Sequence, residues 1–502
     1  MAIDGYRPRN PEATLLYQVV AEQLETFLAG QQARDHTVPG FVEREFRDYL
    51  TCGVLAARGF IRVRCGSCGH ERLVPFSCRR RGWCPSCGGR RMAETAAHLV
   101  DHVFPIVPVR QWVLSIPFAL RYRLAYDSGL LSDVLNVFIR VVFGGLRRRA
   151  RELLGLKLSQ CGAVTFVQRC GDALNLAPHF HSLVIQGVYA ADENGQPEFH
   201  ELPPPEDADV VRVAALVAQR VESLLKRRGL GPDGDSDTAE ALSRDEPGLA
   251  AIYSASIRGR IGLGPHAGNR VLTLGDQVDG DSLDSLQSPR CATVSGFSVH
   301  ANVSIDARDR LRLERLARYV SRPAVSTERL SELPDGRLLY RLKRRWRNGT
   351  TEVVFQRSDF IAKLAALVPA PRAHLRTYHG ILAPAAKWRP RIVPTPDVQF
   401  GVCAHVPVPP ESNRHPGSEP DATGSAPPPR RKNYSWSELL KRVFEIDILV
   451  CERCGGPVRV IAAIQEPETA QQILNYLGLP SRPPPITPAR YERRFHPDDF
   501  AS

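Results

Sequence analysis

Two histidines separated by one residue are the clearest chemical signal in the chain. The stretch from Ala177 to Gly187 reads APHFHSLVIQG and places His179 and His181 in an otherwise apolar run. Side chains alternate across a β-strand, so residues at i and i+2 share one face. Two neutral imidazoles in that arrangement can chelate one divalent ion. The pattern therefore predicts a metal site on a strand, in preference to an ordinary core histidine.

A two-histidine site needs a further ligand, and the preceding segment can supply one. Residues 161–169 read CGAVTFVQR and are rich in strand-forming residues. A turn centred near Gly171–Leu174 would pair this segment antiparallel with the histidine strand and set Gln168 opposite the imidazoles. Gln168 is the predicted third ligand, and Asp172 is the alternative. An oxygen ligand beside two imidazoles favours Mg²⁺ or Mn²⁺.

Two other protein families use a His-x-His pattern, and the residues that follow fit neither of them. A metallo-β-lactamase would need an Asp-His pair after the second histidine, whereas Ser182 and Leu183 follow here. A cupin would need a glutamate shortly after His181, and the sequence has none there. Both families remain as minor alternatives.

A tyrosine on an arginine-lined helix face is the second chemical signal. Residues 306–322 predict a helix that ends at Pro323. One stripe of this helix is apolar: Leu313, Leu316, Ala317 and Val320. A second stripe carries Arg312, Arg315, Tyr319 and Arg322. A phenol with a pKa of about 10 needs a nearby cation or base to act as a nucleophile at pH 7. The second stripe is therefore the arrangement required for a phenol to attack a phosphodiester held by arginines.

Two Cys-x-x-Cys motifs predict a structural zinc site. Cys65 and Cys68 are followed, after fifteen residues, by Cys84 and Cys87, which is the spacing of a four-thiolate site. The tight turn within each motif lets both of its thiolates reach one tetrahedral ion. The second motif lies in RRRGWCPSCGGRR, whose arginines predict contact with nucleic acid: Arg79, Arg80, Arg81, Arg90 and Arg91.

The remaining cysteines leave several interpretations open. Cys52 and Cys78 either replace a ligand of the predicted site or are simply buried. Cys451 and Cys454 form a Cys-x-x-Cys motif with no second motif nearby. To hold a metal, this pair would need ligands from elsewhere: Cys403, His405 or a second chain.

Composition and charge narrow the class of partner. The chain has 502 residues, a formal net charge of +12 and 43% hydrophobic residues, with a pI near 9.3. A folded, basic protein of this kind favours nucleic acid as its partner over an anionic membrane surface. The N-terminus has no apolar signal core, and we expect no stretch of about 18 apolar residues that would span a membrane. We expect a soluble protein without a membrane partner, located in the cytoplasm and associated with the nucleoid, whose cysteines bind metal in preference to forming disulfides.

The segments that must position these residues are a mixture of helices and strands. Helical spacing predicts helices over residues 13–33, 128–153, 208–228 and 306–322. Residues 108–118 and 161–169 predict strands beside the histidine strand. Three segments predict loops or a linker: residues 229–248 and 275–290, rich in Gly, Asp and Ser, and residues 395–433, which contain nine prolines.

A strongly basic segment follows the tyrosine helix. Residues 337–347 read RLLYRLKRRWR and contain six basic residues, with Tyr340 and Trp346 interleaved. This composition suits contact with a nucleic-acid backbone combined with base stacking. The predicted contacts are Lys343, Arg344, Arg345, Trp346 and Arg347. A solvated basic hairpin is the alternative.

Taken together, these residues resemble a known family. The segments that carry the resemblance are CGSCGHERLVPFSCRRRGWCPSCGGRRM, PVRQWVLSIPF, PHFHSLV, RLARYVSRP and TYHGILAPAAKWRPRIVP. The chain is similar to rolling-circle transposases of the insertion-sequence-91 class, which couple an N-terminal zinc-binding domain to an HUH (His-hydrophobic-His) nuclease domain. The resemblance covers roughly residues 40–395, together with the tail LVCERCGGPVRVIAAI.

The resemblance implies an α+β fold in four parts. It places an N-terminal helix and zinc-binding domain at residues 1–100 and a short C-terminal module with the last Cys-x-x-Cys motif at residues 434–502. Between them we expect an HUH-type antiparallel sheet with flanking helices at residues 101–394, with loop insertions near 229–292. A Pro-rich linker at residues 395–433 completes the chain.

The resemblance also implies roles for particular residues. His179 and His181 match the metal ligands of the HUH motif, and Tyr319 matches the nucleophile. Some relatives have two tyrosines four residues apart, whereas Arg315 and Pro323 stand at those positions here. The chain therefore resembles a single-tyrosine version of the family.

The implied activity is metal-assisted cleavage and joining of single-stranded DNA at transposon ends. The tyrosine would form a 5′-phosphotyrosine intermediate with Mg²⁺ or Mn²⁺ at the histidines, while Zn²⁺ would be structural. The protein could also associate with itself. A replication initiator or relaxase with the same chemistry is one alternative, which the setting of the gene between element ends would distinguish. A non-catalytic zinc protein that binds DNA is the other, which metal-binding and nicking assays would distinguish.

Overall fold

A seven-stranded antiparallel sheet lies at the centre of the structure, a computed structural model that describes residues 10–230, 242–275, 289–346, 348–394, 434–444 and 447–490. Its strands follow the order β15-β4-β5-β3-β10-β9, and β11 pairs with β3. Their bounds are β3 Val109–Ser115, β4 Gly162–Cys170, β5 Leu176–Ile185, β9 Cys291–Val294, β10 Phe297–His300, β11 Ser304–Ile305 and β15 Arg376–Gly380. The mixture of helix and sheet confirms the expected class.

The histidine strand β5 occupies the middle of this sheet. It pairs antiparallel with β4 on one side and with β3 on the other. The β4–β5 turn is closed by the Gly171 N–H, which donates to the Asn175 carbonyl at 2.8 Å, and Leu174 adopts a left-handed φ of 56° there. The turn therefore falls where the sequence predicts it.

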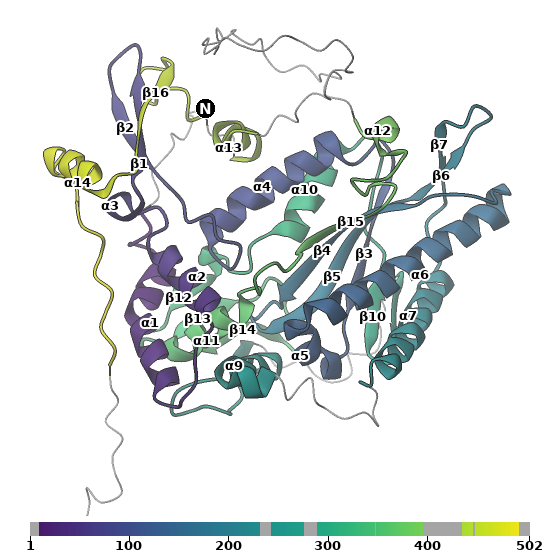
Figure 1. The fold of residues 1–502 in the computed structure, drawn as a ribbon, viewed down its shortest axis with the longest axis horizontal. Coiled ribbons are helices and arrows are strands. Elements are labelled where there is room, and N and C mark those ends of the chain that lie inside the picture. Colours follow the sequence, from purple (N-terminus) through teal and green to yellow (C-terminus); the bar gives the residue numbers. More distant parts are fainter. Residues whose placement is uncertain are drawn as a thin grey trace, which may run out of the picture.

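Helices cover both faces of the sheet (Figure 1). On one face lie α6 (Ser128–Leu154) and α7 (Asp207–Arg227), which share a core with the sheet. On the other face lie α4 (Pro85–His102) and α10 (Arg310–Ser321), which share a second core with it. The sheet domain is thus a three-layered arrangement of helices, strands and helices.

Alternation along β5 assigns its side chains to these two cores. Phe180 and Val184 belong to the core under α6 and α7, whereas Leu183 and Ile185 belong to the core under α4 and α10. The histidines share the parity of the second pair and face α4 and α10.

Helix α6 differs from the sequence expectation in one respect. Among the described residues it is the one helix that is long and apolar enough, by length and composition alone, to cross a membrane. Half of its apolar window is buried inside the protein. Val134, Phe138 and Val142 lie in the core with the sheet. This packing identifies α6 as the central helix of a folded domain.

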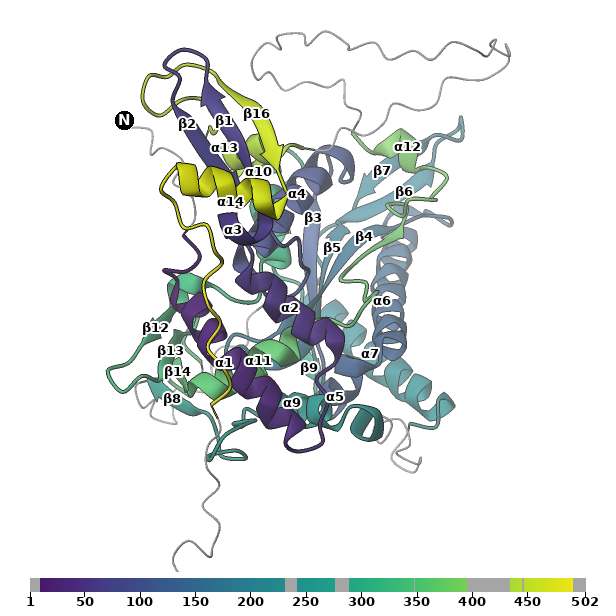
Figure 2. The ribbon, with the colours of Figure 1, turned by 60° about the vertical axis from the view of Figure 1, so that its left-hand side comes forward.

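A third core lies beside the sheet domain, at the side where α1 and α11 are visible in Figure 2. It contains the four-stranded sheet β12-β13-β14-β8. Its strands are β8 Leu272–Gly275, β12 Leu330–Glu332, β13 Leu338–Arg341 and β14 Thr350–Phe355. The helices around it are α1 Leu15–Gln32, α2 Gly40–Leu50, α5 Phe118–Tyr126, α9 Pro247–Ile257, α11 Arg357–Leu367 and the 3₁₀ turn η2 Thr327–Arg329. This body places the predicted basic segment next to the sheet domain.

The C-terminal residues do not form the separate module that the sequence predicts. Strand β16 (Val458–Ile464) pairs antiparallel with β1 (Phe60–Cys65), giving the three-stranded sheet β16-β1-β2. Around it lie β2 Glu71–Pro75, α3 Leu55–Arg58 and α14 Pro467–Tyr476. Ala470 and Leu474 of α14 pack on Phe60. The tail therefore completes the N-terminal domain, because β1 has no other partner on that side among the described strands.

The remaining elements connect these bodies. A two-stranded ribbon, β6 Gly187–Ala191 and β7 Pro197–Glu201, extends from the sheet. Helix α12 (Arg389–Ile392) follows β15, and α13 (Trp436–Phe444) packs on α4. The predicted linker at 395–433 and most of the predicted loops at 229–248 and 275–290 lie outside the described residues.

Candidate functional site

The histidine site lies on the α4/α10 face of β5. The ring centroids of His179 and His181 are 4.9 Å apart. Gln168 on β4 is the direct cross-strand partner of His179, so its side chain shares the same face. The observed register agrees with the position that the sequence predicts for Gln168.

Hydrogen bonds define which ring nitrogen of each histidine can bind a metal. His179 Nδ1–H donates to the Ala177 carbonyl at 2.7 Å, which leaves the Nε2 lone pair free. His181 Nδ1 lies 2.8 Å from the side-chain amide of Gln111, a buried residue of β3. Ligation through His181 Nε2 requires the amide oxygen of Gln111 to face Nδ1–H, a half-turn of the amide. Gln111 is therefore the partner that orients His181, and the sequence prediction missed it.

The amide of Gln168 is oriented toward a ligand role. Its Nε2–H donates to the Val320 carbonyl in α10 at 2.7 Å, and the amide oxygen remains available as an acceptor. Among the residues that the structure describes, no carboxylate, cysteine or third histidine joins His179 and His181 within 4.8 Å of their ligand atoms. Asp172, the alternative, lies 3.6 Å from Arg329 in the β4–β5 turn. The donor set fits one divalent ion with two imidazole nitrogens and an amide oxygen.

The environment keeps both imidazoles neutral. Burial lowers the pKa of His179 below its ordinary value. Burial, and then the neighbouring His179 and Arg322, lower the pKa of His181 well below its ordinary value. Neutral imidazole is the form that binds metal, so these lowered pKa values are compatible with a metal-binding role at neutral pH.

Tyr319 stands beside the histidines. Its ring centroid is 6.1 Å from that of His181, and the two rings are nearly perpendicular. Lys343 Nζ lies 3.7 Å from the ring centroid, and the Arg322 guanidinium carbon lies 4.6 Å from it. Tyr319 is 36% exposed, so a ligand can reach it. The structure thus brings together a tyrosine and a histidine pair that are separated by about 140 residues of sequence.

The predicted helix stripes explain the orientation of Tyr319. Helix α10 begins after Asp309, whose side chain accepts the Arg312 N–H at 2.9 Å, and it ends before Pro323. The apolar stripe is buried against the sheet and α4: Leu313, Leu316, Ala317 and Val320. Because these residues face inward, the opposite stripe with Tyr319 faces solvent and the site.

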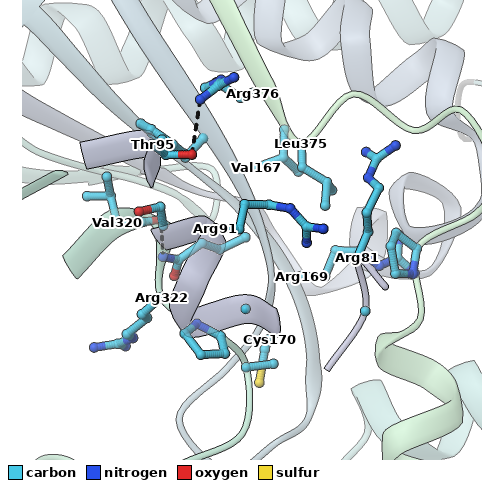
Figure 3. Close-up of a pocket in the computed structure, with 18 of the residues that line it drawn as sticks. Arg81, Arg91, Thr95, Val167, Arg169, Cys170, Val320, Arg322, Leu375 and Arg376 are labelled. Carbon is cyan, nitrogen blue, oxygen red and sulfur yellow. Dashed lines mark hydrogen bonds between the residues drawn. The ribbon is translucent and has the colours of Figure 1, made fainter. Parts of the chain in front are cut away.

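A basic cleft of about 870 Å³ adjoins the site. Figure 3 shows its wall, to which α4, β4, β15 and the end of α10 contribute. Seven cationic residues line it: Arg81, Arg91, Arg169, Arg322, Arg329, Lys343 and Arg376. Burial lowers the pKa of Arg91, and the charge of Arg81 lowers it further. Crowded cations of this kind favour a polyanion as the ligand.

The arginines that the sequence predicts to bind DNA fall into several settings. Arg81, Arg91, Arg322 and Lys343 line the cleft. Two others contact the protein: Arg80 pairs with Asp48, and Arg90 lies over Trp436. The remaining described residues of this set are exposed and do not line the cleft: Arg79, Arg312, Arg315, Arg344, Arg345 and Trp346. Arg347 lies outside the described residues.

The sequence prediction missed some cleft residues and misassigned one. Arg169, Arg329 and Arg376 reach the cleft from positions that carry no motif. Tyr340, expected to stack on bases, is fully buried, and its hydroxyl accepts a hydrogen bond from Arg329 at 2.6 Å. Alternation within β13 points the Tyr340 side chain into the third core, so it cannot reach a nucleic acid.

The structure does not bring the four predicted zinc ligands together. It divides cysteines into two groups of four, each with sulfur atoms within 4.8 Å of one another: Cys52, Cys78, Cys84 and Cys87; and Cys65, Cys68, Cys451 and Cys454. The first Cys-x-x-Cys motif lies in the β1–β2 hairpin turn, whereas the second lies at the start of α4. The predicted grouping is wrong because it relied on linear spacing alone. The two motifs lie on separate elements, and each joins a different group of cysteines.

The group at the start of α4 has the geometry of a zinc site. The Cys52–Cys87 and Cys52–Cys84 sulfur distances are both 3.7 Å, and the Cys78–Cys87 distance is 3.3 Å. A tetrahedral ion with Zn–S bonds of about 2.3 Å separates its sulfurs by about 3.8 Å. All four cysteines are buried. These residues fit a structural Zn²⁺.

Residues 162–389 match the transposase family Y2_Tnp. Residues 20–116 match the transposase zinc-binding domain, Zn_Tnp_IS91. The chain belongs to the insertion-sequence-91 class of transposases. The matched zinc-binding range contains the whole buried cysteine group of this transposase, and the matched transposase range contains its histidines and Tyr319. No curated protein and no solved structure matches the transposase.

Family membership establishes the coarse activity. A transposase cleaves and joins DNA, so DNA is the partner of this protein. The matched zinc-binding domain and the cysteine groups support structural Zn²⁺. The basic cleft lies between the zinc-binding domain and the transposase range, since Arg81 and Arg91 come from the first and Arg322 and Arg376 from the second.

Proposed function

We propose that this transposase cleaves a single DNA strand by attack of the Tyr319 hydroxyl on a backbone phosphate. The supporting observation is the position of the Tyr319 ring, 6.1 Å from the His181 ring and faced by Lys343 and Arg322. A nucleophile, a pair of metal ligands and two cations thus meet at one exposed point. The position of the histidines on a central strand of an antiparallel sheet supports the proposal of an HUH-type nuclease.

The reaction exchanges one phosphate ester for another. As the bond from the tyrosine oxygen to phosphorus forms, the bond from phosphorus to the 3′ oxygen breaks. The phenolic proton leaves to solvent and the 3′ oxygen takes up a proton, which gives a 5′-phosphotyrosine and a free 3′-OH. The reverse attack by a 3′-OH rejoins a strand without ATP, as rolling-circle transposition requires.

The side chains of the site divide the work. His179, His181 and the Gln168 oxygen would hold Mg²⁺ or Mn²⁺, which when bound polarises the phosphate and offsets part of its charge. Arg322 and Lys343 orient the phosphate against the tyrosine and stabilise the negative charge that develops on it. Gln111 fixes the ring of His181.

A single strand fits this site better than a duplex. The reacting phosphate must reach a ring that is only partly exposed and that lies beside the buried His181. The adjoining cleft has cations on several walls, which can follow a flexible backbone. The substrate in this proposal is single-stranded DNA from the ends of the element, met in the cytoplasm at the nucleoid.

The experiment that tests the proposal detects a covalent adduct. The purified protein is incubated with Mn²⁺ and a single-stranded oligonucleotide from an element end, and the products are separated under denaturing conditions. Tyr319→Phe should abolish the adduct because phenylalanine has no hydroxyl to attack phosphorus. His181→Ala should reduce it by at least about 100-fold.

The control variant is Tyr476→Phe, since Tyr476 on α14 is 90% exposed and remote in sequence from the site. It should form the adduct at the unmodified level. An adduct of undiminished yield in Tyr319→Phe would exclude Tyr319 as the nucleophile. Tyr378 on β15 would then be the next residue to test, because Tyr340 is buried.

A further inference from the structure

The second group of cysteines is formed by Cys65, Cys68, Cys451 and Cys454, and only the first two lie within the matched zinc-binding domain. Cys65 is the last residue of β1, and Cys68 lies in the hairpin turn that follows. Cys451 and Cys454 come from the C-terminal tail. Cys451 is the 383rd residue after Cys68. The tyrosine site gives no reason for these four cysteines to lie together.

The sulfur geometry matches a tetrahedral ion. The Cys65–Cys454 distance is 3.5 Å, and the Cys68–Cys451 distance is 3.7 Å. These values are close to the separation of about 3.8 Å expected for Zn–S bonds of about 2.3 Å. They are far above the disulfide length of about 2.05 Å, and all four cysteines are free thiols.

The two Cys-x-x-Cys turns have the same backbone conformation. In the first, the Cys65 N–H donates to the His70 carbonyl at 2.9 Å, and the Gly69 N–H donates to the Cys65 carbonyl at 3.1 Å. In the second, the Cys451 N–H donates to the Gly456 carbonyl at 2.8 Å, and the Gly455 N–H donates to the Cys451 carbonyl at 2.8 Å. Gly69 and Gly455 share a φ of 72°. Two matching turns that face each other are the arrangement that presents four thiolates to one ion.

The turns are packed against each other without room for a side chain. The Gly66 N–H donates to the Pro457 carbonyl at 2.9 Å. A Cβ atom at Gly456 would lie 2.7 Å from the Ser67 Cβ. At Gly59 a Cβ atom would lie 2.1 Å from the Ile464 carbonyl oxygen. The tail therefore docks at a defined register at both ends of β16.

We propose that Cys65, Cys68, Cys451 and Cys454 bind a second zinc ion, which fastens the C-terminal tail to the N-terminal domain. The metal joins β1 to the strand that completes its sheet. This proposal does not depend on the tyrosine chemistry, because it concerns cysteines on another face of the fold.

The fastened tail reaches the catalytic domain through α13. Leu439 of α13 packs on Ala93 and Ala97 of α4. Arg442 forms ion pairs with Asp101 of α4 and with the buried Glu314 of α10. Its guanidinium lies 2.7 Å from the Glu314 carboxylate. Tyr434, just before α13, lines the basic cleft. The second zinc thus anchors a segment that holds together the zinc-binding domain and the helix of Tyr319.

The first test measures zinc per full-length chain after purification. The unmodified protein should contain two zinc ions, and Cys451→Ser/Cys454→Ser should contain one. Cys52→Ser/Cys78→Ser should also contain one, from the other site. The control Cys291→Ser, outside both groups, should contain two. A single zinc in the unmodified protein, or two in Cys451→Ser/Cys454→Ser, would overturn the proposal.

A rescue variant separates ligation from simple folding of the tail. Cys454→His offers an imidazole nitrogen in place of a thiolate. The variant should therefore contain two zinc ions, as the unmodified protein does. Substitution of Co²⁺ should then give the absorption of a tetrahedral three-sulfur site. A Cys454→His chain that is folded by circular dichroism yet holds one zinc would count against ligation at this position.

The fastening role is tested by cutting the chain. A protease site inserted within residues 395–433 allows the tail to be severed in the otherwise complete protein. The severed tail should remain bound in the presence of zinc and dissociate from Cys451→Ser/Cys454→Ser. A tail that stays bound to that variant, or after chelation has removed both zinc ions, would show that β16 and α14 hold it without metal.

Discussion

At the scale of single residues, the site depends on amides as much as on charged groups. Gln111 orients His181, and Gln168 links the neighbouring strand β4 to α10 through the Val320 carbonyl. In the proposed site, a neutral amide ligand would leave the metal without a negative charge from the protein. The positive groups around the site would then oppose metal binding until a phosphate arrives, and metal and DNA should strengthen each other's binding.

Gln168 and Asp172 can be distinguished by metal affinity. In the Tyr319→Phe background, Gln168→Leu should weaken Mn²⁺ binding at least about tenfold, because the amide oxygen is lost. Asp172→Asn should leave it unchanged, because Asp172 faces Arg329. Calorimetric titration with Mn²⁺, with an uncleaved oligonucleotide present, measures both. A large loss in Asp172→Asn alone would reverse the assignment.

Lys343 should make DNA binding depend on pH. Burial, and then the nearby Arg322 and Arg344, lower the pKa of Lys343 to about 8. A lysine carries its charge below its pKa, so this cation is present at pH 7 and mostly lost at pH 9. Oligonucleotide affinity, measured by fluorescence anisotropy, should fall across that range.

Lys343→Arg should remove most of this decline, because a guanidinium keeps its charge at pH 9. Lys226→Arg, at an exposed ion pair with Glu222 on α7, serves as the control and should decline as the unmodified protein does. A pH profile for Lys343→Arg that matches the unmodified one would exclude Lys343 as its source.

At the scale of elements, the zinc-binding helix is fitted directly against the tyrosine helix. A Cβ atom at Gly88 in α4 would lie 2.7 Å from the Cβ of Pro323, the residue that ends α10. Gly88 directly follows Cys87, so the buried zinc group and the end of α10 are neighbours. Removing this zinc should therefore disturb the position of Tyr319.

Two adjacent glycines provide a matched test of that contact. Alanine in a helix stabilises it by about 0.5–1 kcal/mol relative to glycine. Gly89→Ala has no atom within 4 Å of its new methyl group, so it should raise the melting temperature. Gly88→Ala should lower it and slow adduct formation, because Pro323 must move. Equal effects of the two substitutions would show that the α4–α10 contact is soft.

Local sequence pattern predicted the elements and the faces on which the histidines and Tyr319 lie, but not the long-range grouping of the cysteines. Alternation in β5 and the stripes of α10 require only neighbouring residues, and the short β4–β5 turn sets the register of Gln168. The cysteine groups depend on how β1 meets β16 across the sequence, which spacing cannot encode. Gln111 was missed for the same reason, since its partner His181 lies 70 residues further on.

At the scale of the whole molecule, the basic cleft draws its seven cationic residues from both matched ranges. Arg81 and Arg91 of the zinc-binding domain line the same cleft as Arg322 and Arg376 of the sheet domain. A strand bound there would contact both domains. The zinc-binding domain would then act as one wall of the DNA site.

Salt dependence measures this shared contact. Each phosphate neutralised on single-stranded DNA contributes about 0.7 to the slope of log affinity against log salt concentration. Arg81→Met/Arg91→Met should therefore reduce the slope by about 1.4. Arg227→Met, at the end of α7, should leave the slope unchanged. An unaltered slope in the double variant would place the strand elsewhere.

The pairing of β16 with β1 has a consequence for how the protein is made. Cys65 on β1 and Cys454 before β16 are 389 residues apart, and a ribosome adding about 5–20 residues per second needs roughly 20–80 s between them. During that interval the β1–β2 hairpin must wait with one edge exposed. A chain truncated before Val458 would keep His179, His181 and Tyr319 and still lack the strand that completes the β1–β2 sheet. Assembly of that sheet therefore has to await the synthesis of β16.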